Sequence, residues 1–222
     1  MVMGKYPPCQ RLPEHKTKGE RAEYITKALK LLYPEAPCAL EYENDPYRLL
    51  VMARLSAQCT DERVNKVSKE LFRCYPDCRA MANAPIERLE ELVRSCGVYR
   101  VKAKNIKDMS AMLLERTGGE VPCDKEFLLS LPGVGPKIAN LILGDVFKVP
   151  GIVADTHCIR LSNRFSLCDS DDPLKVERAL SPVIEPCEQS DFCHRLVMFG
   201  REFCRAQGPD CRNCPLAEKG KE

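Results

Sequence analysis

Lys137 and Asp155 are the two residues whose type and position in the sequence could support covalent chemistry. Lys137 lies one residue into a helix predicted to begin at Pro136, where the positive helix end and a dry setting would both disfavour the ammonium form. A lysine with a lowered pKa is a nucleophile. Asp155 lies just before another predicted helix, where an aspartate ordinarily caps the helix, and a cap can also be catalytic. On residue type alone, a surface lysine and a capping aspartate remain the alternative.

The segment LPGVGPK, residues 131–137, forms a turn between two predicted helices that could bind a phosphate. Its glycines allow a turn too tight for side chains, and Pro136 suits a helix start. Such a turn exposes backbone N–H groups, which act together with the positive helix end on an anion. DNA held in this way is bound by its backbone, regardless of sequence. A plain helix–helix corner would contain the same turn, so the segment alone leaves the function open.

Three cysteines are clustered near the C-terminus in the pattern Cys204-x6-Cys211-x2-Cys214. Compact thiolate spacings of this kind are typical of iron–sulfur clusters or zinc sites. The remaining cysteines are spread irregularly along the chain and, in a reducing compartment, are expected to be small buried hydrophobes. They are Cys9, Cys38, Cys59, Cys74, Cys78, Cys96, Cys123, Cys158, Cys168, Cys187 and Cys193.

The composition is that of a globular, cytoplasmic protein. The 222 residues are 44% hydrophobic and 30% charged, which excludes the disordered and membrane classes. No run approaches the roughly 20 apolar residues of a spanning helix, and the N-terminus lacks the apolar centre of a secretory signal. The net charge of +2 gives little support for nucleic-acid binding, so a nucleic-acid partner would have to be held by local groups.

The elements that must position these residues are all helical. Apolar residues recur at helical spacing, as in Ala103, Ile106, Met109 and Leu113, and hairpin signals for strands are missing. Proline at helix starts and glycine at helix ends agree with this interpretation. The expected helices are 20–33, 46–58, 61–73, 86–95, 101–116, 124–130, 136–147, 156–164, 173–185 and 190–203.

Several motifs in one order resemble the endonuclease III family of DNA glycosylases, of the helix-hairpin-helix superfamily. They are LPGVGPKIAN at 131–140, LSAQCTD at 55–61, VADTH at 153–157 and the three clustered cysteines. The resemblance spans roughly residues 20–216. It implies a two-lobed all-α fold with a DNA-binding cleft between the lobes. We expect an irregular arm at 1–17, a six-helix domain at 39–149 containing the helix-hairpin-helix, and a second domain built from 18–38 and 150–222.

The resemblance implies roles for the catalytic pair. Lys137 corresponds to the family lysine whose amine attacks C1′ of a damaged nucleotide, expels the base and leaves a Schiff base from which β-elimination nicks the strand. Asp155 corresponds to the aspartate that deprotonates the incoming amine and stabilises positive charge on the sugar. The expected enzyme is a base-excision glycosylase with lyase activity on oxidised pyrimidines. The alternatives are a non-catalytic helix-hairpin-helix DNA-binding protein, a monofunctional glycosylase for another lesion, and a structural or redox iron–sulfur protein.

The resemblance also implies DNA contacts. A flipped base leaves a gap in the duplex, and Gln58 corresponds to the family glutamine that enters it. Val98 occupies the facing loop, where the family often has a longer leucine. The other expected DNA-binding residues are Leu131, Gly133, Val134, Gly135 and His157. The expected partner is double-stranded DNA with damaged bases or abasic sites, bound by a monomer in a bacterial or archaeal cytoplasm.

The family pattern for the cysteines is Cys-x6-Cys-x2-Cys-x5-Cys, which holds a [4Fe-4S] cluster. Cys204, Cys211 and Cys214 match its first three positions, but the fourth is Gly220. Glycine has no donor atom, so a four-iron cluster needs water, an added ligand or another side chain such as Cys187 or Cys193. A three-iron cluster, a zinc ion or an empty loop are the alternatives.

Overall fold

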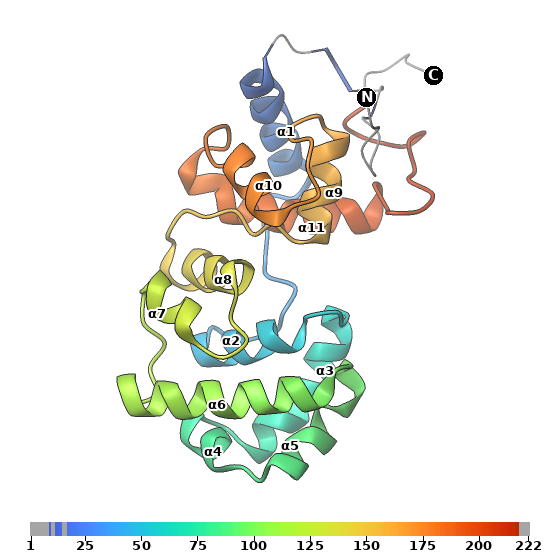
Figure 1. The fold of residues 1–222 in the computed structure, drawn as a ribbon. Helices are drawn as coiled ribbons and strands as arrows, with labels where there is room; N and C mark the ends of the chain where they lie inside the picture. The colour runs from blue at the N-terminus through green and yellow to red at the C-terminus, as the bar shows by residue number, and fades with distance from the viewer. Residues whose placement is uncertain (1–8, 10–11, 15–16, 218–222) are drawn as a thin grey trace. The chain divides into compact units, whose positions relative to one another are not determined.

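The structure, a computed structural model, describes residues 9, 12–14 and 17–217, and all regular structure among them is helical. This confirms the expected all-α class. The chain divides into two compact units, one comprising Cys38–Phe147 and the other joining residues up to Pro37 to those from Lys148 onward. We call them the central unit and the terminal unit (Figure 1). Most of the arm expected at 1–17 lies outside the described residues, as does Gly220.

The central unit contains seven α-helices among its described residues, one more than the six expected for 39–149. They are α2 (Pro46–Leu55), α3 (Asp61–Cys74), α4 (Cys78–Asn83), α5 (Ile86–Leu92), α6 (Tyr99–Thr117), α7 (Lys125–Ser130) and α8 (Pro136–Phe147), with a 3-10 turn at Arg94–Cys96. The unexpected helix is α4, whose six residues show little periodicity and are not followed by a glycine, unlike those of the equally short α7. It begins where Asp77 accepts a hydrogen bond from Ala80 N.

The long helix α6 packs against α4 and α5, while α2 packs against α8 (Figure 1). Helix α2 begins at Pro46 with Asp45 as its cap, as the sequence predicted, but ends at Leu55 rather than at 58. The helix ends earlier because residues 56–58 form a turn in which Gln58 has a left-handed backbone, with a φ of +54°. Three of the expected DNA-contacting segments, the turn after α2, the loop before α6 and the turn before α8, therefore adjoin packed helices.

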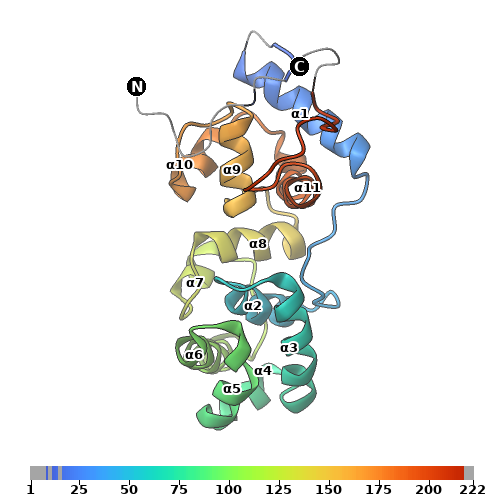
Figure 2. The same ribbon diagram turned by 90° about the vertical axis from the view of Figure 1, so that its right-hand side faces the viewer.

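The terminal unit is built from α1 (Lys18–Leu32), α9 (Thr156–Arg164), α10 (Pro173–Leu180) and α11 (Gln189–Glu202), with a 3-10 turn at Pro186–Glu188. Helix α1 starts with a capping box between Thr17 and Glu20. Its buried stripe packs against α11, which also packs against α9 (Figure 2). Elements from the two ends of the chain thus share one core. Helix α10 ends five residues before the expected 185, because Ser181 caps it.

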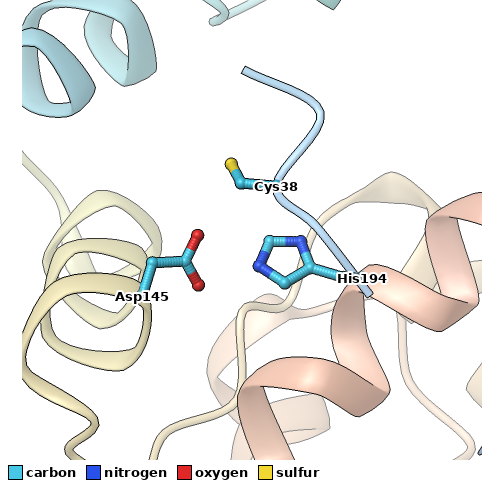
Figure 3. A group of neighbouring side chains, drawn as sticks. All are labelled: Cys38, Asp145 and His194. Atoms are coloured by element: carbon cyan, nitrogen blue, oxygen red, sulfur yellow. The ribbon is translucent and has the colours of Figure 1, made fainter. Parts of the chain in front are cut away.

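Cys38 and Asp145 lie near the two ends of the central unit's sequence, and Figure 3 shows their side chains together. Burial and the neighbouring Asp145 carboxylate raise the pKa of Cys38 to about 12. The neutral thiol is therefore compatible with the carboxylate beside it. His194, labelled in the same figure, belongs to α11 of the terminal unit. No helix in the described part of the chain is both long and apolar enough to span a membrane.

Candidate active site

The turn before α8 is held against two other helices of the central unit. Gly133 has a φ of +78°, and a Cβ at this position would overlap the side chains of Arg54 on α2 and Asn105 on α6, with Arg54 Cδ only 2.8 Å away. The side-chain oxygen of Asn105 accepts two hydrogen bonds from Arg54, at 3.0 and 3.1 Å, and its side-chain nitrogen donates to Val101 O at 3.2 Å. Glycine is required here both for its backbone conformation and for this close approach. The sequence indicated the glycine but not the Arg54–Asn105 pair beneath it.

The apolar residues of the same turn point inward. Leu131 and Val134 are buried, and Val134 N donates to Leu131 O at 3.1 Å. Their side chains stabilise the turn and do not form its outer surface. Gly135 lies at the helix start, and a Cβ there would have no atom within 4 Å. The accessible part of the turn is therefore its glycine backbone, which is what a phosphate site needs.

Lys137 lies in the first turn of α8, directly after the glycine turn, as predicted. Its side chain is exposed, so the dry setting expected from the sequence is wrong for the protein as the structure describes it. From Ala139 to Gly144 every residue of the helix is buried. The amine is thus carried on a packed helix at its positive end and directed to the surface.

Gln58 and Val98 share an unusual backbone conformation. Gln58 has a φ of +54° and Val98 a φ of +44°, although neither is glycine. Left-handed backbone is uncommon for such residues and is strained for a β-branched valine. Both side chains are exposed, and that of Val98 keeps 58% of its accessible surface. Two turns of the central unit therefore each present one side chain at a strained apex.

A buried lysine joins these two turns. Lys102 on α6 is only 1% exposed, and its ammonium donates to Leu55 O at 2.8 Å and to Cys96 O at 2.5 Å. Leu55 precedes the Gln58 turn, and Cys96 precedes Val98. Burial lowers the pKa of Lys102. Lys102 was not singled out from the sequence, although it stands four positions before Ile106 and so falls on the apolar stripe of α6.

Asp155 and His157 lie in the terminal unit, at the start of α9. Asp155 caps the helix, since its Oδ1 accepts from Cys158 N at 2.7 Å, and within the described residues its Oδ2 accepts no hydrogen bond. His157 Nδ1 lies 3.1 Å from an Arg160 guanidinium nitrogen. A Cβ on Gly200 of α11 would overlap both of these side chains. The capping role considered for Asp155 is present, and its carboxylate is half-buried.

The cysteine loop follows α11 and is bound to α9 by two arginines. Arg160, which is buried, donates a hydrogen bond to Cys204 O at 3.0 Å. Arg164 Nη1 donates a hydrogen bond to Cys204 Sγ at 3.1 Å. Arg164 also donates to the carbonyls of Arg205 and Ala206, at 2.7 and 3.2 Å. Helix α9, which Asp155 caps, therefore orders the first ligand of the expected metal site. Neither arginine was singled out from the sequence.

Three half-buried thiols lie on this loop: Cys204, Cys211 and Cys214. Burial raises the pKa of Cys204 and of Cys214, and Arg164 opposes this for Cys204. Thiolates with an arginine donating to one sulfur fit an iron–sulfur cluster, whose properties depend on such hydrogen bonds. The loop thus offers three thiol ligands, one fewer than the four cysteines of the family's [4Fe-4S] pattern.

Cys193 and Cys187, the two cysteines considered from the sequence as a fourth cluster ligand, both lie outside the cysteine loop. Cys193 is buried, and its Sγ accepts from Val153 N at 3.3 Å. Cys187 is exposed on the 3-10 turn before α11, as is Cys123 before α7. The expectation that the scattered cysteines are buried is confirmed for four of the eleven: Cys78, Cys96, Cys158 and Cys193. Five others are only half-buried: Cys9, Cys38, Cys59, Cys74 and Cys168. The expectation is wrong for Cys187 and Cys123, which are exposed in connecting segments.

Comparison with known proteins gives one consistent result. Residues 51–186 match the family model described as "HhH-GPD superfamily base excision DNA repair protein". The chain is 45% identical over 202 residues to "Endonuclease III" of Synechocystis sp., covering 90% of this chain and 92% of that one. It is also 43% identical to the protein in "Structure of a non-covalent Endonuclease III-DNA Complex", with a TM-score of 0.86 and coverage of 91% and 94%. The same identity and coverage, with a TM-score of 0.85, apply to "Structure of a Trapped Endonuclease III-DNA Covalent Intermediate: Estranged-Adenine Complex".

Proposed function

The chain belongs to the HhH-GPD superfamily of base excision DNA repair proteins, and we propose that it is a bifunctional DNA glycosylase and abasic-site lyase that uses Lys137 as its nucleophile. The observation that carries this proposal is the position of Lys137, in the first turn of α8 directly after the glycine turn. The relative trapped as a covalent DNA intermediate supports it. The proposed substrates are oxidised pyrimidines and abasic sites in double-stranded DNA, and the proposed location is the bacterial or archaeal nucleoid.

In the proposed reaction the neutral amine of Lys137 attacks C1′, and the bond from C1′ to the base breaks with its electron pair leaving on the base. Asp155 accepts a proton from the attacking nitrogen, for which its Oδ2 is suited because Oδ1 is engaged by Cys158 N. The sugar opens to a Schiff base, loss of a C2′ proton expels the 3′ phosphate, and water then releases Lys137. Because Lys137 is exposed in the protein described alone, bound DNA must exclude the water around it.

DNA is proposed to be held by backbone amides of Gly133 and Gly135 on phosphates, with His157 as a further backbone contact. Gln58 fills the gap left by the extruded base, and Val98 on the facing loop is the second side chain that enters it. Support comes from the exposed side chains and strained backbones of Gln58 and Val98. Strain of this kind is typical of functional positions.

Cys204, Cys211 and Cys214 are proposed to hold a [4Fe-4S] cluster. The cluster would supply no step of the reaction; it would fix the loop that carries Arg205 and Arg212. Those arginines would then face DNA phosphates. The fit rests on the half-buried thiols and on the hydrogen bond from Arg164 to Cys204 Sγ.

Borohydride trapping on duplexes containing thymine glycol or an abasic site tests the proposed nucleophile. Wild type and Lys104→Ala, which alters an exposed lysine on α6, should both give a covalent adduct, whereas Lys137→Ala should bind DNA without one. Asp155→Asn should slow base release strongly and leave the fold intact. An adduct that persists in Lys137→Ala would remove the assignment of the nucleophile. Tight binding by wild type without any adduct would favour the non-catalytic or monofunctional alternative.

A further inference from the structure

Cys9 lies beside the cysteine loop, although it is far from that loop in the sequence. Its backbone N–H donates to Arg164 O at 2.7 Å. Through its side chain, the same Arg164 donates to Cys204 Sγ at 3.1 Å and to Cys204 O at 3.3 Å. One arginine at the end of α9 therefore fixes both Cys9 and the first cysteine of the loop.

The thiol of Cys9 is half-buried and lies within electrostatic range of the thiols of Cys204 and Cys214. Three thiolates would repel one another unless a cation lay among them, as a cluster's iron atoms do. The chemistry of this neighbourhood is that of a soft-metal site with ligands from both ends of the terminal unit.

Further contacts fix the surroundings of Cys9. Leu12, shortly after it, is buried. On the loop, Leu216 is fully buried and its carbonyl accepts from Tyr24 OH of α1 at 3.4 Å. The end of the cysteine loop is thus bound to α1, and Cys9 is bound to α9. Both are held by helices that would frame one metal site.

We propose that Cys9 supplies the fourth thiolate of the cluster held by Cys204, Cys211 and Cys214. The inference rests on the cluster put forward under the proposed function, but not on the lyase reaction. It accounts for the glycine at position 220, because the ligand would come from the N-terminal segment instead. Each of the four thiols loses a proton as its sulfur binds iron.

The test compares full-length wild type with Cys9→Ser, Cys204→Ser and Cys187→Ser, each loaded anaerobically with ferrous iron and sulfide. Cys187→Ser is the matched control, because it removes an exposed cysteine of the same unit. We expect wild type and Cys187→Ser to show a four-iron spectrum and Cys204→Ser to lose it. Cys9→Ser should release iron to a chelator at least about ten-fold faster and give the electron paramagnetic resonance signal of a three-iron cluster after mild oxidation.

Mass spectrometry after alkylation gives an independent readout without any substitution. Cys9 should be protected in the loaded wild-type protein and alkylated after iron is removed, while Cys187 is alkylated in both states. Equal alkylation of Cys9 in both states, or a Cys9→Ser cluster that matches the control, would overturn the proposal. A wild type that takes up no iron would also overturn it. Because borohydride trapping through Lys137 needs no cluster measurement, a failure of this inference is distinguishable from a failure of the proposed function.

Discussion

Replacing Lys102 by methionine would remove the ammonium group that joins the Gln58 turn to the Val98 loop. Methionine has a similar length and fills the buried volume, so the main change is the loss of two hydrogen bonds, to Leu55 O and Cys96 O. A buried carbonyl left without its donor costs about 1–3 kcal/mol. Relief of the buried charge returns part of this cost. We expect a net decrease of about 2–4 kcal/mol in the free energy of unfolding.

Urea unfolding followed by circular dichroism measures this quantity, with Lys104→Met as the matched control on the same helix. Lys104 is exposed and pairs only with Asp108, four residues on, so its replacement should cost about 0.5 kcal/mol or less. A change for Lys102→Met that is no larger than that of the control would show that the two carbonyl contacts contribute nothing.

The same variant should separate the two activities of the enzyme. Extruding a base costs a few kcal/mol, and an abasic site has no base to unstack. The Gln58 turn and the Val98 loop are proposed to stabilise the duplex with its base extruded. If the substitution removes about 1.4 kcal/mol of that stabilisation, base release slows about ten-fold. Single-turnover release from a thymine glycol duplex should therefore fall about ten-fold more than cleavage at a preformed abasic site. Equal slowing on both substrates would refute the assignment of Gln58 and Val98 to the gap.

Three further predictions concern the turn, the terminal unit and the cysteine loop. Gly133→Ala should destabilise the protein by about 2 kcal/mol, because position 133 has a positive φ and an added Cβ would overlap neighbouring side chains. Gly135→Ala should change the free energy of unfolding by less than about 0.5 kcal/mol, because an added Cβ has no atom within 4 Å there. Urea unfolding of both variants tests this contrast. Glu188 has its pKa held below the ordinary 4.5 by Lys30 and then by Arg195, so its stabilising contribution is present above pH 4.5 and lost as the pH falls through the lowered value. Glu188→Gln should thus be less stable at neutral pH and show a shallower loss of stability below pH 4.5; identical pH profiles would contradict this. Arg164→Met should lower the iron retained after anaerobic loading, because it removes the donor to Cys204 Sγ, and unchanged iron content would exclude that role.

Helices with an apolar stripe or a clear boundary signal were predictable from the sequence. Each of the ten expected helices has a counterpart, including the six-residue α7, which is followed by the glycine turn. Helix α4 has the same length but no glycine after it, so the sequence did not indicate it. Helix α2 was expected to be too long because nothing in LSAQ indicates that Gln58 adopts a left-handed backbone. Local turn geometry depends on contacts with other segments, here on Lys102.

The positions of the expected site residues were predictable, but their surroundings were not. Lys137 follows the glycine turn and Asp155 caps a helix, as expected, yet the predicted dry setting around Lys137 is absent in the described structure. Whether a side chain at a helix start is buried depends on which other segments cover it. The spacing of apolar residues along the sequence does not predict those contacts. The hydrogen bond from Cys9 N to Arg164 O, beside Cys204, is likewise a tertiary contact between distant parts of the chain, without a local signal.

The division of the terminal unit between two distant segments has a consequence for synthesis on the ribosome. Helix α1 is translated before the whole central unit, but its partner α11 is translated after it. At ~5–20 residues per second, the roughly 150 intervening residues take on the order of 10–30 s to make. The central unit can fold during that interval, while the apolar side chains of Ala22, Ile25 and Leu29 on α1 are still without α11 to pack against. The nascent chain thus displays an apolar stripe that chaperones can recognise until the last helix emerges.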